Sequence, residues 1–103
     1  MLTDYELFLT GCYGAVVEIK NENELESFMN LMKELGFSKY VNWLSRLGTK
    51  GLMESAKYNG IKQVCFEYQM GKGFTFGDKQ EYIDSCDETK ILSLEDLIKS
   101  VRE

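Results

Sequence analysis

Basic and aromatic side chains alternate through the middle of the chain, a mixture typical of proteins that bind nucleotides or single-stranded nucleic acid. Lysine and arginine neutralise phosphates, and aromatic rings stack on bases. The candidate binding residues are Lys39, Tyr40, Trp43, Arg46, Lys50, Lys57, Tyr58 and Lys62. The same rings could instead anchor this segment to a hydrophobic core while the charged side chains stay in water. The sequence leaves both interpretations open.

A second candidate site lies in the stretch MGKGFTFGDK, residues 70–79. Its run KGFTF matches the start of the RNA-binding strand of RRM domains, except at Thr75, where glycine or alanine is expected. In that motif two exposed rings stack on bases, so Phe74 and Phe76 are candidate RNA-binding residues. The alternative is a hairpin turned by Gly71 and Gly73, with both rings in the core. The two interpretations differ in which face of the hairpin the rest of the protein covers.

Acidic residues recur in the segment that follows, with a tyrosine among them. The candidate protein-binding residues are Asp78, Glu81, Tyr82, Asp84, Asp87 and Glu88. Carboxylates spaced along a surface can occupy the basic cleft of a nucleic-acid enzyme in place of phosphates. A calcium loop would need acidic residues at every second position and a glycine in the turn, and this segment has neither. The segment therefore indicates a protein-binding surface or an ordinary solvated one.

The composition argues against catalysis. The chain has 103 residues, a formal net charge of −5 and no histidine, the side chain that most readily transfers protons near neutral pH. Its three cysteines are far apart and form no Cys-x-x-Cys pair, so neither a zinc site nor a disulfide framework is indicated. We therefore expect a non-enzymatic protein that binds no metal or cofactor.

The elements that would position these residues form one α+β domain over residues 1–103, a small antiparallel sheet covered by helices. The predicted strands lie near 13–20, 61–69, 73–77 and, as a short strand, 90–92. The predicted helices lie at 22–35, 38–47, 50–58 and 93–102.

Two helix starts carry clear local signals. Asn21 and Glu24 have the spacing of an N-cap pair, and apolar residues then recur at helical spacing until Gly36. Thr3 and Glu6 have the spacing of a capping box, which predicts a short N-terminal helix; an edge strand is the alternative for that segment.

Two segments, NENELESFMNLMKELGF and GFTFGDKQEYIDSCDETKILSLEDLIK, resemble small accessory proteins of phages and mobile elements of Gram-positive bacteria, including anti-CRISPR proteins. The resemblance implies an inhibitor that binds a host or phage protein, above all a host nucleic-acid-targeting defence protein. The alternatives are a nucleotide- or nucleic-acid-binding module, such as a sponge for a signalling nucleotide, and an immunity protein or antitoxin.

The N-terminal segment carries acids where a targeting sequence needs lysine or arginine, and no apolar run is long enough to span a membrane. We therefore expect a protein of the host-cell cytoplasm with no membrane contact. The sequence is compatible with a homo-oligomer.

Overall fold

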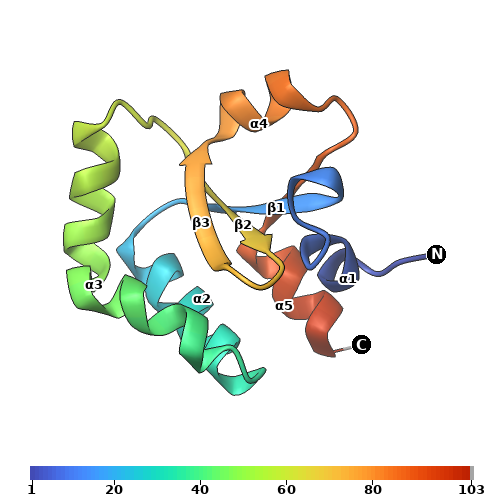
Figure 1. Cartoon of the computed structure of the whole chain (residues 1–103), viewed down its shortest axis with the longest axis horizontal. Coiled ribbons are helices and arrows are strands. Elements are labelled where there is room, and N and C mark those ends of the chain that lie inside the picture. Colours follow the sequence, from blue (N-terminus) through green and yellow to red (C-terminus); the bar gives the residue numbers. More distant parts are fainter. Residues whose placement is uncertain (103) are drawn as a thin grey trace.

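The computed structural model describes residues 1–102, with side chains described for residues 1–37 and 48–102. Within this range four strands form one mixed sheet in the order β3-β2-β1-β4 (Figure 1). The elements in chain order are α1 (Asp4–Phe8), η1 (Gly11–Tyr13), β1 (Ala15–Ile19), α2 (Glu22–Glu34), α3 (Ser38–Tyr58), β2 (Val64–Gln69), β3 (Gly73–Asp78), α4 (Lys79–Ser85), β4 (Lys90–Ser93) and α5 (Leu94–Arg102).

The α+β fold predicted from the sequence is confirmed, and each predicted strand has a counterpart in the sheet. The helices predicted at 38–47 and 50–58 are the two parts of α3. They meet at Gly48, where the backbone (φ 71°, ψ 160°) leaves the helical region. At the N-terminus, α1 begins with the predicted capping box between Thr3 and Glu6, so the edge-strand alternative is wrong.

The sheet is mixed, which corrects the prediction of an antiparallel sheet. β2 pairs antiparallel with both β1 and β3, whereas β4 pairs in parallel with β1. Since β3 and β4 therefore run in the same direction, the chain must cross the sheet between them. Residues 79–89 make this crossover. They include α4, a helix that the sequence pattern did not predict.

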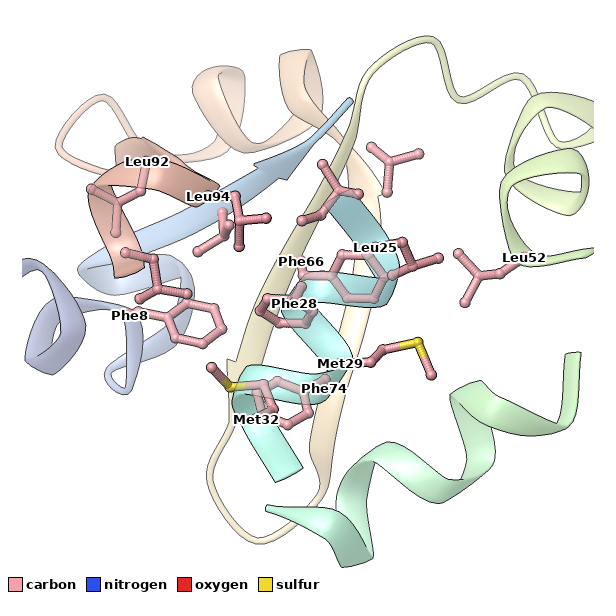
Figure 2. Packing of buried hydrophobic residues seen from close by; sticks show 14 of the residues in the cluster. Phe8, Leu25, Phe28, Met29, Met32, Leu52, Phe66, Phe74, Leu92 and Leu94 are labelled. Atoms are coloured by element: carbon pink, nitrogen blue, oxygen red, sulfur yellow. The ribbon is translucent and has the colours of Figure 1, made fainter. Parts of the chain in front are cut away.

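The hydrophobic core lies between the sheet and α2 (Figure 2). The ring centroid of Phe28 on α2 lies 5.2 Å from that of Phe66 and 5.7 Å from that of Phe74. Phe8 from α1 stacks on Phe74 with a centroid distance of 6.0 Å. Helix α2 begins where predicted, because the Asn21 side chain accepts a hydrogen bond of 2.9 Å from the backbone N–H of Glu24.

Strand β3 turns both of its phenylalanines toward this core. Phe74 is 2% exposed, and the half-buried Phe76 packs on Phe66 with a centroid distance of 5.6 Å. A ring that stacks on a base needs an open face, and here α2 covers the phenylalanine side of the hairpin. For Phe74 the prediction of nucleic-acid binding is therefore wrong. Phe76 is only half-buried but lies on the same covered side, and this RRM-like stretch forms a core strand.

Candidate functional site

The acidic segment begins with a residue that holds two parts of the chain together. One carboxylate oxygen of Asp78 accepts hydrogen bonds from the backbone N–H groups of Lys62, at 2.9 Å, and Gln63, at 3.0 Å. Its other oxygen accepts a bond of 3.3 Å from the N–H of Gln80 and so caps α4. These backbone hydrogen bonds lower the pKa of Asp78. Asp78 therefore anchors the start of α4 to the segment before β2.

The middle of α4 rests on the sheet through Tyr82. This side chain lies over Gly77, where a Cβ atom would come within 3.2 Å of the phenol oxygen. Burial raises the pKa of Tyr82, and the nearby carboxylate of Glu67, itself 9% exposed, raises it further. Cys65 and Glu67 alternate with Phe66 along β2, so Tyr82 covers the sheet face opposite to the one that α2 covers.

Hydrogen bonds also hold the end of the crossover, where it reaches β4. The hydroxyl of Thr89, a residue that is 9% exposed, donates a hydrogen bond to the backbone carbonyl of Cys12. Next to it, the N–H of Lys90 donates a bond of 2.9 Å to the carbonyl of Gly14. Both bonds join the crossover to the turn before β1. The segment from α4 to β4 is thus held at its start, middle and end.

Four carboxylates remain on the outer side of this crossover. We call them the acidic face: Glu81, Asp84, Asp87 and Glu88, all exposed. Ile83, 36% exposed, lies in the same stretch, and Asp84 accepts a hydrogen bond of 2.9 Å from the side chain of Gln80. No ion pair joins any of the four to another side chain that the structure describes. Figure 1 shows α4 apart from α2 and α5, so the acidic face is distant from these two helices.

The predicted basic middle is only partly brought together. The side chains of Lys39, Tyr40, Trp43 and Arg46 lie outside the described residues. Lys50 and Tyr58 are exposed. Lys57 and Lys62 do converge, because they line one cavity of about 300 Å³.

Lys20 joins these two lysines at the cavity, and sequence reasoning missed it. It follows β1 directly, far from the basic middle in the chain, and no local motif marks it. Only the antiparallel pairing of β1 with β2 brings the end of β1 beside the segment that contains Lys62.

The cysteines are free and differ in their surroundings. Cys65 is fully buried, and this burial raises the pKa of its thiol to about 12. Burial also raises the pKa of Cys12. The pKa of Cys86 is lowered by its polar neighbours, first the Thr89 side chain and then the backbone of Glu88. Within the described part of the chain, no three side chains of the metal-ligating types gather in one place.

Comparison with protein-family models, with curated proteins and with solved structures finds no match to this chain. Over residues 1–102, no helix is long and apolar enough to cross a membrane. What the protein binds must therefore be inferred from its own surfaces.

Proposed function

We propose that this protein is a non-catalytic inhibitor whose acidic face binds a basic surface of a nucleic-acid-targeting defence protein. The observation that carries the proposal is the acidic face itself, four unneutralised carboxylates on a crossover that is held at three points. A segment that is already ordered loses little conformational freedom on binding, so more of the interaction energy remains as affinity.

The charge of the acidic face supports a partner that normally binds phosphates. A nucleic-acid-binding surface presents lysine and arginine side chains, and these would pair with Glu81, Asp84, Asp87 and Glu88. Ile83 would add an apolar contact between the charged groups. The resemblance to anti-CRISPR and other anti-defence proteins supports a host defence nuclease as the partner. Binding there would exclude the nucleic acid that the nuclease must reach.

A cleavage assay tests this proposal. Purified CRISPR effector complexes and restriction endonucleases would be titrated with the full chain while DNA cleavage is measured. In a variant that carries Asp84→Lys, Asp87→Lys and Glu88→Lys, we expect the inhibitory concentration to rise at least about tenfold. Added salt should also weaken inhibition, because exposed charges are screened over about 8 Å at physiological ionic strength.

A matched control carries the same change of net charge elsewhere. Glu26, Glu34 and Glu54 are exposed on α2 and α3, and their replacement by lysine should leave inhibition intact. Inhibition that survives reversal of the acidic face, or that both variants lose equally, would exclude this face as the contact. If the wild-type chain inhibits no nuclease of the panel, the proposed function itself is wrong.

A further inference from the structure

Three lysines from separate segments of the chain, Lys20, Lys57 and Lys62, line one cavity. This cavity, of about 300 Å³, opens between the end of β1, the second part of α3 and the residues that lead into β2. Figure 1 shows that α3 stands beside the sheet there and that a long connection joins it to β2. Three separate segments of the chain therefore build the cavity.

The floor of the cavity is apolar. Ile19 and Val64 are 2% and 4% exposed and pair with each other across β1 and β2. Met53 from α3 and Ile61 lie beside them, both partly buried against the core. Because these side chains belong to the core, the floor is preformed. It offers a flat or apolar part of a ligand a surface that excludes water.

The rim of the cavity is basic in a protein whose net charge is −5. Lys20, Lys57 and Lys62 are all exposed, and none of them is in an ion pair with a described carboxylate. Lys62 does lie near Asp78, whose pKa it helps to lower. The one acidic residue of the lining, Glu18, is neutralised by Lys79, whose ammonium lies 3.3 Å from its carboxylate. The lining therefore carries an excess of positive charge.

A helix dipole accounts for only one of the three lysines. Lys57 lies in the last turn of α3, where a positive charge interacts favourably with the helix dipole. Lys20 and Lys62 lie outside the helices and have no such role. Like charges brought together repel each other, which argues for a ligand that carries the opposite charge.

We propose that this cavity binds a mononucleotide, with its phosphate at the three lysines and its base or sugar on the apolar floor. The volume is at the lower end of the range of about 300–1,000 Å³ for ligand sites, which favours one nucleotide over a longer chain. Gln63, also in the lining, supplies a side-chain amide for the hydroxyl groups of a sugar. This binding is separate from the proposed inhibition at the acidic face.

NMR titration of the full chain tests the site. AMP, GMP, CMP and UMP would be added separately to isotope-labelled protein, with the four matching nucleosides and inorganic phosphate as partial ligands. At least one monophosphate should shift the backbone amides of Lys20, Ile61 and Val64, and it should bind more tightly than its own nucleoside or phosphate. Replacement of Lys20, Lys57 or Lys62 by glutamine should weaken binding about two- to fivefold for each lysine removed.

A control variant removes three exposed lysines from other places, Lys33, Lys72 and Lys99, and should bind as the wild type does. The site is refuted if no monophosphate shifts the cavity amides at millimolar concentration, or if both lysine sets weaken binding equally. If phosphate alone binds as tightly as the best of the four monophosphates, the assignment to a nucleotide is wrong. The glutamine variants of the cavity should still inhibit nucleases, which keeps this test independent of the proposed function.

Discussion

Replacement of Phe74 by alanine distinguishes a core strand from an RNA-binding strand. The ring is 2% exposed, and its centroid lies 5.4–6.0 Å from those of Phe8, Phe28, Phe37 and Tyr68. Core Phe→Ala substitutions destabilise proteins by about 3–5 kcal/mol. Because four rings would lose a neighbour at once, we expect a loss near the upper end, about 4–5 kcal/mol in the free energy of unfolding.

Urea unfolding followed by circular dichroism measures this loss. With a slope of about 1.5 kcal/mol per molar urea, the midpoint should fall by about 3 M. Such a loss is a large share of the roughly 5–15 kcal/mol that stabilise a typical domain, so a milder variant is needed. Phe74→Leu keeps most of the apolar volume and should cost about 1.5 kcal/mol or less.

Two neighbours on the same strand serve as controls. Phe76 is half-buried, and its replacement by alanine should cost about 1–2 kcal/mol. Thr75 points to the other face and is partly exposed, so Thr75→Ala should change stability by about 0.5 kcal/mol or less. The placement of this strand in the core is refuted if the free energy of unfolding of Phe74→Ala lies within about 1 kcal/mol of the wild-type value. It is also refuted if the three alanine variants are equally stable.

Two further predictions concern the crossover and the cysteines. Asp78→Asn should speed hydrogen exchange of the Lys62, Gln63 and Gln80 amides, because an amide side chain cannot accept all three of their bonds. Since folding lowers the pKa of Asp78 below its ordinary value of 3.8, its contribution to stability is present above that pH and is lost as the pH falls through the lowered value. The difference in urea midpoint between wild type and variant should therefore shrink in acid, and a difference that grew there would contradict this role. Iodoacetamide at neutral pH should label Cys86 before Cys12 and should reach Cys65 only after unfolding, because polar neighbours lower the pKa of Cys86 while burial raises the pKa of the other two thiols. Peptide mass spectrometry measures the order, and early labelling of Cys65 would refute it.

Local sequence signals were sufficient for the elements whose starts and ends depend on neighbours in the chain. Asn21 and Glu24 begin α2, and the capping box of Thr3 and Glu6 begins α1, because these hydrogen bonds form within one helical turn. Gly48 interrupts α3 through its own backbone conformation. These helix starts and this interruption can therefore be predicted without knowing the rest of the fold.

The helix α4 had no comparable signal. It has seven residues and none of them is fully buried, so it lacks the apolar periodicity that marks α2. Its position depends on Asp78, which reaches back to residues 62 and 63, and on the contact between Tyr82 and Gly77. These contacts span parts of the chain that meet only after the sheet has formed. The sequence could therefore identify the acidic residues without showing that a helix presents them.

The sequence by itself determined the α+β class, the hairpin at Gly71 and Gly73, and the separation of acidic and basic stretches, because these follow from composition and from short-range spacing. Only the tertiary structure decided which face of the hairpin is covered. The position of α2 across the sheet settles that question, and a period-two pattern is the same for either face. The parallel pairing of β4 with β1, and the meeting of Lys20 with Lys57 and Lys62, likewise depend on the path of the chain between distant segments. Contacts between residues far apart in sequence carry no local signature, and both candidate binding surfaces of this protein depend on them.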